Sequence, residues 1–460
     1  MNEKKSDFHS EAGAVAGGDS VRPVAMQRRL KSRHIMMMAL GGAIGAGMFK
    51  GSSTSITLAG PSVVLAYGFG GLILLFIMSG LAEMTVARPS AGTFRELIEP
   101  LLGPFAGHLV GWMYWLDWVL VMAAETAASA TFLQYWFPQF PLWLMSLLVS
   151  VALTLLNLFQ VSIYGETEYW LAGVKIAVLI LFILFGGSLL FTGYGPHVAS
   201  EFHNLTAAGG FFPHGWKGLA ASMLVVMFSF GGTEMVGMTM GETDHPEQVI
   251  PRAARSVIVR ILIFYVLPIL VIVSLVPWNQ LGGVNAPSPF VEVFHAIGIP
   301  FVGSLMNFVM LTAVLSATNT GMYAASRMLY RQSLAGQAPH WFAHLSKQGV
   351  PLSALLMSTV FLYVGVGVAF FAAGNTFNYL MVIPGYSVLV VWMGIGLAHV
   401  RSRPQGRWPI FSLFAVAALA VILLGIIVTS PWQGTLISLA TVVIVAGGYL
   451  LRGRGTRREC

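Results

Sequence analysis

Charged residues are scarce in this sequence. Only 9% of its 460 residues are Asp, Glu, Lys or Arg, whereas soluble domains carry about 25%. A soluble chain this long would need far more polar surface to cover its core. Hydrophobic types reach 56%, which excludes an intrinsically disordered chain. Long uninterrupted apolar runs disfavour a porin-like barrel, whose strands alternate apolar and polar residues. The remaining class is an all-α integral membrane protein.

Cysteine is almost absent, since Cys460 is the only one. A disulfide within the chain is impossible, and a metal site built from several thiolates is excluded. Histidine is missing from the interior of the apolar segments, because His34, His295 and His399 fall at segment edges. This pattern argues against a bis-histidine haem protein or a redox membrane enzyme. The sequence therefore predicts no cofactor, no metal site and no enzymatic activity.

What the sequence does contain is a series of apolar runs, each about 20 residues long, the length needed to cross a bilayer. We interpret these runs as twelve transmembrane helices. Their predicted ranges are 34–58, 61–87, 106–136, 141–162, 170–193, 217–241, 253–276, 299–327, 352–373, 377–400, 408–429 and 434–451.

The basic residues predict the topology. If residues 1–33 form a cytoplasmic tail and twelve spans follow, 22 of the 25 lysines and arginines lie on the cytoplasmic side. This is the positive-inside distribution, and it accounts for the net charge of +7 without a nucleic-acid partner. We therefore expect a multi-pass protein of the cytoplasmic membrane with both termini in the cytoplasm, the second tail being 452–460.

Two predicted spans are interrupted by glycine. The first reads LGGAIGAGMF at 40–49, and the sixth reads FSFGGTEMVG at 228–237. Each glycine weakens a helix by about 1 kcal/mol, so we expect both helices to unwind there. Their separation by five helices predicts an inverted repeat with broken helices at equivalent positions. The two halves would be 34–193 and 217–400, followed by two additional helices at 408–451.

Broken helices expose backbone groups at mid-membrane, where only a cavity or buried contacts tolerate them. Free N–H groups near Ala46 and Gly47 suit an anion, and carbonyls near Ala43, Phe228 and Gly231 suit an ammonium group. Together these groups predict a site for a zwitterion, although glycine-mediated helix packing is the alternative. The neighbouring residues complete the candidate substrate-binding set: Ile44, Gly45, Phe230 and Gly232.

Four ionisable side chains fall inside predicted spans and are functional candidates by default. Glu234 follows the second break and either carries a proton or braces the unwound segment. Lys175 either snorkels to the inner surface or supplies a fixed cation between spans. Glu125 lies mid-span and is a candidate substrate contact. Asp117 either serves the site or hydrogen-bonds to the tryptophans around it.

Several stretches resemble the amino acid permeases of the amino acid–polyamine–organocation superfamily, in its bacterial amino acid transporter branch. The two most specific are RRLKSRHIMMMALGGAIGAGMFKGS at 28–52 and FSFGGTEMVGMTMGE at 228–242. AGPSVVLAY at 59–67 and the stretches at 251–265 and 311–330 extend the resemblance over residues 28 to about 450.

The resemblance implies a leucine-transporter-type fold, with five-plus-five inverted repeats and two further helices. It implies that Phe228 is the gating aromatic and that Glu234 is the acid of the sixth span. The family's lysine of the fifth span falls on Lys175, where its ammonium takes the place that sodium occupies in sodium-coupled relatives. A hydroxyl of the eighth span, such as that of Ser316, would be its neighbour.

We therefore expect a secondary transporter that imports amino acids by proton symport with alternating access. Glu125, if charged, would repel an acidic side chain, which favours neutral substrates. Exchange of amino acids or amines, uptake of cationic amino acids, and a nutrient receptor built on the same scaffold remain the alternatives. The expected partners are an amino acid, a proton and the lipid bilayer.

Overall fold

The computed structural model describes residues 44–159, 164–192, 202–240, 245–282, 287–346, 349–372, 375–403 and 409–455, and within these ranges the chain is helical with no strand. The first half comprises α2 (Ala46–Phe49), α3 (Gly51–Ala59), α4 (Val63–Ala87), α5 (Phe94–Leu102), α6 (Pro104–Gln134), α7 (Leu142–Phe159) and α8 (Tyr164–Thr192). The second half comprises α9 (Gly215–Phe230), α10 (Pro246–Ile261), α11 (Leu267–Leu275), α12 (Pro289–Ala296), α13 (Pro300–Leu334), α14 (Leu352–Phe371), α15 (Thr376–Ser402), α16 (Ile410–Thr429) and α17 (Trp432–Gly455). Short 3-10 and π turns connect them: Gly60–Ser62, His203–Leu205, Thr233–Met238, Leu262–Val266, Trp278–Gln280 and His340–Ala343.

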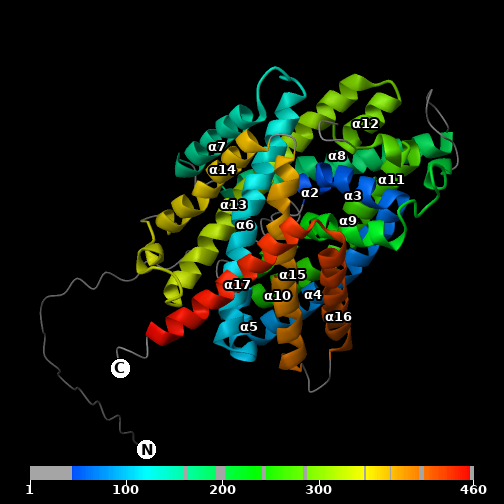
Figure 1. Cartoon of the computed structure of the whole chain (residues 1–460). Helices are drawn as coiled ribbons and strands as arrows, with labels where there is room; N and C mark the ends of the chain where they lie inside the picture. The colour runs from blue at the N-terminus through cyan, green and yellow to red at the C-terminus, as the bar shows by residue number, and fades with distance from the viewer. Residues whose placement is uncertain are drawn as a thin grey trace, which may run out of the picture.

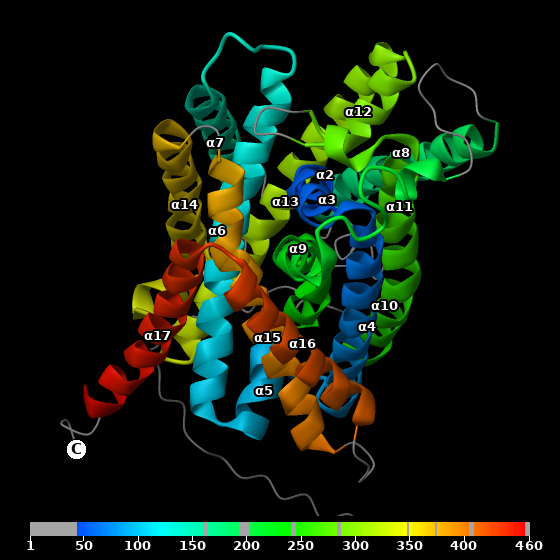
Figure 2. The ribbon, with the colours of Figure 1, turned by 45° about the vertical axis from the view of Figure 1, so that its right-hand side comes forward.

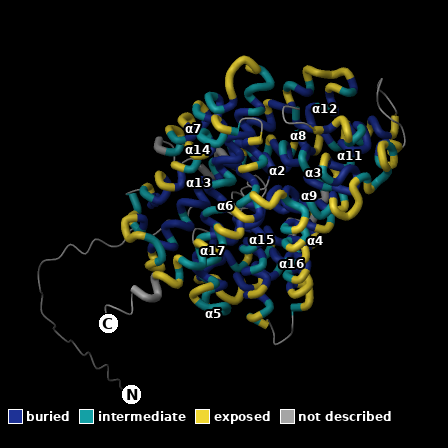
Figure 3. The backbone as a smooth tube through the Cα atoms, viewed as in Figure 1, coloured by how far each residue is buried: buried dark blue, intermediate teal, exposed yellow. Residues whose placement is uncertain are grey.

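The helices form a bundle around α6 and α9 (Figures 1 and 2). α6 packs most extensively against α13 and α15, and α9 lies against α3, α4, α15 and α16. The most apolar 18-residue stretches of Pro104–Gln134, which is α6, and of Gly215–Met238, which is α9 with the turn after it, are each 78% buried. The corresponding stretch of α17 is only 17% buried. Figure 3 shows the same gradient, with buried segments inside the bundle and exposed segments along its rim. The centre of the molecule is therefore built from α6 and α9.

Ten helical segments within the described ranges are long and apolar enough to cross a membrane, and they define a multi-pass membrane protein. Nine of them overlap the predicted third and fifth to twelfth spans. The tenth, Gly51–Ala87, joins the predicted end of span one to span two through the turn at Gly60–Ser62. The predicted fourth span corresponds to a shorter apolar helix, Leu142–Asn157. The count of twelve spans stays a prediction.

The rim of the bundle is apolar, as a lipid-facing surface requires. Large hydrophobic side chains protrude from its outer helices, including Phe191, Phe301, Phe371 and Val428, each at least 80% exposed. In water such side chains would form large exposed apolar patches. In a bilayer they contact acyl chains, so their exposure is consistent with the composition that excluded a soluble fold.

Two helix ends face each other in the bundle. α2 begins at Ala46 after an extended Gly45 (φ −138°, ψ −152°), and Lys50 continues it into α3 with helical dihedrals. α9 ends at Phe230, and Gly232 follows with φ 97°, a left-handed conformation that glycine adopts without strain. A 3-10 turn, Thr233–Met238, then continues the chain. The predicted first half of span one, residues 34–43, lies outside the described residues.

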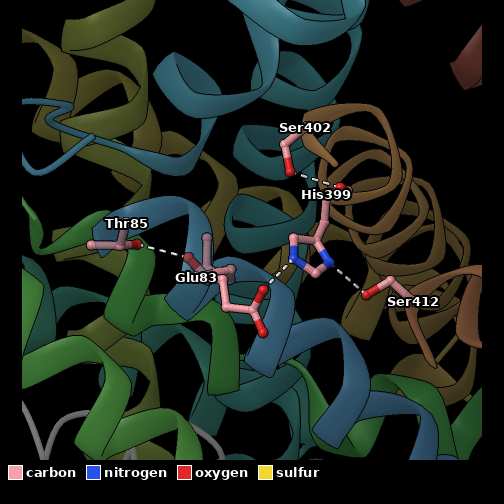
Figure 4. A network of polar contacts seen from close by, with 6 residues as sticks. Glu83, Thr85, His399, Ser402 and Ser412 are labelled. Atoms are coloured by element: carbon pink, nitrogen blue, oxygen red, sulfur yellow. Dashed lines mark hydrogen bonds and ion pairs between the residues drawn. The ribbon is translucent and has the colours of Figure 1, made fainter. Parts of the chain in front are cut away.

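A polar network joins α4, α15 and α16 at one end of the bundle (Figure 4). The buried His399 ring lies 3.0 Å from a Glu83 carboxylate oxygen through Nε2 and 2.8 Å from the Ser412 hydroxyl through Nδ1. Gly80 makes room for this ring, because a Cβ built there would lie 2.8 Å from Nδ1. The network therefore links three helices through one imidazole.

Candidate functional site

A cavity lies between the start of α2, the middle of α6 and the end of α9. The space between them, its solvent-open part included, is about 300 Å³. Three helices that are distant in sequence therefore enclose one space. The lining residues are Gly45, Gly47, Asp117, Trp118, Val121, Glu125, Phe228, Ser229, Gly231 and Gly232.

The Glu125 carboxylate, which belongs to α6, is bound by the first turn of α2. The Ala46 N–H lies 2.9 Å from Oε1 and 2.9 Å from Oε2, and it donates to this carboxylate. Glu125 is only 4% exposed. Gly45 allows this approach, because a Cβ built there would overlap Glu125 Oε1. The N–H group predicted to bind a substrate carboxylate is thus bound by a carboxylate of the protein itself.

Gly47 brings α2 against the end of α9. A Cβ built at Gly47 would lie 2.6 Å from the Ser229 Cα, so only glycine permits this backbone approach. The Ser229 carbonyl accepts a 2.9 Å hydrogen bond from the Tyr265 hydroxyl, in the π turn that joins α10 to α11. The two helix ends that line the cavity are therefore held together by direct backbone packing.

Glu234 holds the turn that follows α9. Its Oε1 accepts from the Gly232 N–H at 3.1 Å, and its Oε2 accepts from Trp392 Nε1 on α15 at 3.2 Å. The side chain is fully buried and does not line the cavity. These contacts tie the turn after α9 to α15.

Lys175 lies inside the bundle rather than at its surface. It is 1% exposed, and its Nζ donates a 2.8 Å hydrogen bond to Ser316 Oγ on α13. Its charge also attracts the Glu125 carboxylate. The structure therefore brings together the two residues that the family resemblance pairs, Lys175 and Ser316.

The two phenylalanines of the second break lie in different surroundings. Phe228 lines the cavity and packs edge to face against Phe377 of α15, with ring centroids 5.8 Å apart. Phe230 lies outside the cavity lining, in an aromatic cluster with Tyr67 and Tyr265. Ile44 is buried and also lies outside the lining. Ala43 lies outside the described residues.

Sequence reasoning missed part of the lining. Trp118, Val121 and Ser229 were not assigned to the site, and Asp117 was left between two roles. One signal was present, because Asp117, Val121 and Glu125 recur every four residues and so share one face of a helix. Without the position of α2, that face could not be distinguished from the faces packed against other helices.

Comparison with known proteins identifies the family. A model of the amino acid permease family matches residues 34–449 of this chain. The chain therefore belongs to the amino acid permease family, within the superfamily that the sequence motifs indicated, and the proteins of this family are transporters rather than enzymes.

Individual relatives match this chain along most of their own length. The chain is 50% identical over 438 residues to the uncharacterised amino acid permease YvbW of Bacillus subtilis, covering 93% of this chain and 98% of the relative. It is 42% identical over 383 residues to the γ-aminobutyric acid permease of the same organism, covering 83% and 81%. It is 40% identical over 446 residues to the aromatic amino acid transport protein AroP of Escherichia coli K12, covering 93% and 96%.

Proposed function

We propose that this permease imports amino acids by proton symport with alternating access. The contact between Glu125 and the Ala46 N–H carries the proposal. A substrate carboxylate needs the same N–H group, since it is a donor in the first turn of α2, between the cavity-lining Gly45 and Gly47. Substrate binding therefore displaces Glu125 from Ala46.

The displacement of Glu125 couples substrate binding to proton binding. Two carboxylates in one buried cavity repel each other strongly, because the interior screens charge poorly. A proton bound by Glu125 removes this repulsion and leaves the N–H group to the substrate. Binding of substrate and binding of a proton then favour each other, which is the thermodynamic requirement for symport.

Lys175 supplies the coupling cation of this scheme. Its ammonium is buried on Ser316, and it attracts Glu125 in the absence of substrate. A fixed ammonium at this position takes the place of a sodium ion, so we expect transport that does not require sodium. When Glu125 is protonated, the Lys175 charge becomes available to balance the substrate carboxylate.

The helix ends at Gly45 and Gly231 support the proposed architecture. We infer that they are the breaks of spans one and six in a five-plus-five inverted repeat over 34–193 and 217–400, with two further helices at 408–451. Relative tilting of the segments beyond the breaks would open the cavity to either side in turn. Phe228, which lines the cavity, would gate one route.

The orientation follows from the basic residues. We infer that the protein lies in the cytoplasmic membrane with twelve spans and both tails, 1–33 and 452–460, in the cytoplasm. The positive-inside distribution supports this arrangement, and it directs the proton gradient of a living cell toward uptake.

Neutral amino acids are the proposed substrates. Asp117 and Glu125 both line the cavity, and an acidic side chain would meet both. The relatives named for γ-aminobutyric acid and for aromatic amino acids also support a substrate that carries one carboxylate. Cationic amino acids would be favoured only if both carboxylates stayed charged with substrate bound.

Reconstitution in proteoliposomes tests the proposal. A panel of labelled amino acids would be offered with an inward proton gradient, without a gradient, and with an inward sodium gradient. We expect accumulation of at least one neutral amino acid only with the proton gradient. Accumulation that needs an internal amino acid or amine and ignores pH would instead show an exchanger. Binding without any flux would instead show a receptor.

A further inference from the structure

Asp117 is a buried carboxylate without a partner in the part of the chain that the structure describes. It is 2% exposed and lines the cavity, yet it makes no hydrogen bond or ion pair there. The other two acids of the region are satisfied, Glu125 by Ala46 and Glu234 by Gly232 and Trp392. A buried polar group without a hydrogen bond is costly, so a donor that enters the cavity is the natural partner for Asp117.

The neighbouring residue directs its donor away from Asp117. Trp118 is 1% exposed, and its indole interacts with the Tyr114 side chain. The adjacent Tyr114 packs edge to face against this ring and directs its hydroxyl to the Met235 sulfur at 3.9 Å. Trp115, one turn away, donates to Ser358 instead. Neither Trp115 nor Trp118 therefore donates to Asp117.

Asp117 lies about two helical turns before Glu125 on α6, and both residues line the cavity. Asp117, Val121 and Glu125 follow one another at four-residue spacing on α6, and all three line the cavity. Eight residues of helix rise about 12 Å. A substrate whose carboxylate took the Ala46 N–H could extend its side chain past Val121 toward Asp117.

The walls of this path are partly aromatic, because the Trp118 and Phe228 rings both line it. Aromatic side chains pack well against each other in offset or edge-to-face arrangements. At the end of the path stands an acceptor that needs a donor. An aromatic ring that carries an N–H or O–H group at its far edge satisfies both features.

We propose that Asp117 is a specificity-determining residue that accepts a hydrogen bond from the far end of the substrate side chain. The preferred substrates are amino acids with a donor-bearing ring, namely indole, imidazole or phenol. The inference rests on the proposed amino acid transport and names the substrate class of the same cavity. A site built around a buried acceptor discriminates strongly against analogues that lack the donor.

Analogue pairs that differ only in the donor test this inference in proteoliposomes. Tryptophan is compared with 3-benzothienylalanine, in which sulfur replaces the indole N–H, and tyrosine is compared with phenylalanine. Each compound competes with uptake of whichever amino acid the panel shows to be transported. We expect the donor-bearing member of each pair to compete at least tenfold better in the wild-type protein.

Variants assign the discrimination to Asp117. Asp117→Ala should bring both competition ratios close to one, mainly by weakening the donor-bearing member. Asp117→Asn keeps a carbonyl acceptor and should retain part of the ratio. Val121→Ala, which removes an apolar contact of the same wall, is the matched control and should shift both members of a pair equally.

The outcomes separate this inference from the proposed function. Equal competition within both pairs in the wild-type protein would overturn the role of Asp117, even if a neutral amino acid is transported. Unchanged ratios in Asp117→Ala would also overturn it. Preference for lysine over every aromatic amino acid would overturn the proposed substrate class. If no amino acid is transported at all, the proposed function itself fails.

Discussion

The carboxylate of Glu125 binds the backbone N–H of Ala46, with both oxygens 2.9 Å from the nitrogen. The residues are 79 positions apart in the sequence, and the contact joins the middle of α6 to the first turn of α2. An acid of the protein thus occupies the group that a substrate acid would need. Competition between two carboxylates for one donor is a direct way to make proton binding and substrate binding depend on each other.

The first prediction concerns Glu125→Gln. Glutamine keeps a carbonyl oxygen for Ala46 but cannot exchange a proton, so the competition no longer depends on pH. We expect accumulation driven by a proton gradient to fall at least tenfold, while exchange of labelled for unlabelled substrate across the membrane stays within a few-fold of wild type. Uptake and counterflow in the same proteoliposomes measure the two quantities.

Glu247→Gln is the control for this substitution. Glu247 pairs with the exposed His245 on the surface, where an ion pair contributes little, and both activities should stay at wild-type levels. Full accumulation by Glu125→Gln under a proton gradient would show that Glu125 is not the proton-binding group.

The second prediction concerns the two glycines of the α2 turn. Gly45→Ala places a methyl group on Glu125, and Gly47→Ala places one on the Ser229 backbone. A side chain can move aside more easily than backbone, so Gly45→Ala should mainly weaken substrate binding. Gly47→Ala should also destabilise the fold by about 1–3 kcal/mol, as overpacking does.

Substrate binding and the midpoint of thermal unfolding in detergent measure these two effects. The control is Gly187→Ala, since a Cβ at Gly187 meets no atom within 4 Å. It should leave both quantities unchanged. Wild-type affinity in Gly45→Ala and Gly47→Ala would remove the idea that a substrate carboxylate approaches the backbone here.

The third prediction concerns Gly80 on α4. A methyl group there would press on the His399 ring, which is 4% exposed and joins Glu83 to Ser412. We expect Gly80→Ala to lower the free energy of unfolding by about 1–3 kcal/mol while transport by the surviving protein continues. Gly68→Ala on the same helix meets no atom within 4 Å and should not lower the unfolding midpoint. Equal midpoints for the two variants would show that the network does not stabilise the bundle.

Much of the membrane architecture could be predicted from the sequence, because apolar length and glycine placement act locally. Nine predicted spans each overlap one membrane-length apolar helix of the structure, and α9 ends at Phe230, directly before Gly231 and Gly232. The boundary between spans one and two was harder to predict from the sequence. Gly60 and Pro61 form only a short 3-10 turn there, so helical structure runs on from Gly51 to Ala87.

The side-chain environment of the site could not be predicted in the same way. Ionisable residues inside apolar spans marked Asp117, Glu125 and Lys175 as candidates, because a charge in a span is costly wherever it points. Which partner each one meets depends on the packing of α2, α6, α8 and α13 together. The same limit explains Phe230, which follows Phe228 by two residues but packs against Tyr67 and Tyr265 outside the cavity.

The last prediction concerns Lys175 and Ser316. Lys175→Met keeps most of the apolar stem but removes the buried ammonium that attracts Glu125 and bonds Ser316 Oγ at 2.8 Å. Without this charge nothing balances the substrate carboxylate in the proposed scheme, so accumulation driven by a proton gradient should be lost. Ser316→Ala leaves the ammonium in place and removes one charge-assisted hydrogen bond, worth about 1.5–3 kcal/mol. Its effect should therefore be smaller than that of Lys175→Met.

Uptake would be measured with a proton gradient and with a sodium gradient for wild type and both variants. Full proton-driven accumulation by Lys175→Met would refute the coupling role, and stimulation of the wild-type protein by sodium would show that the ammonium does not replace a sodium ion.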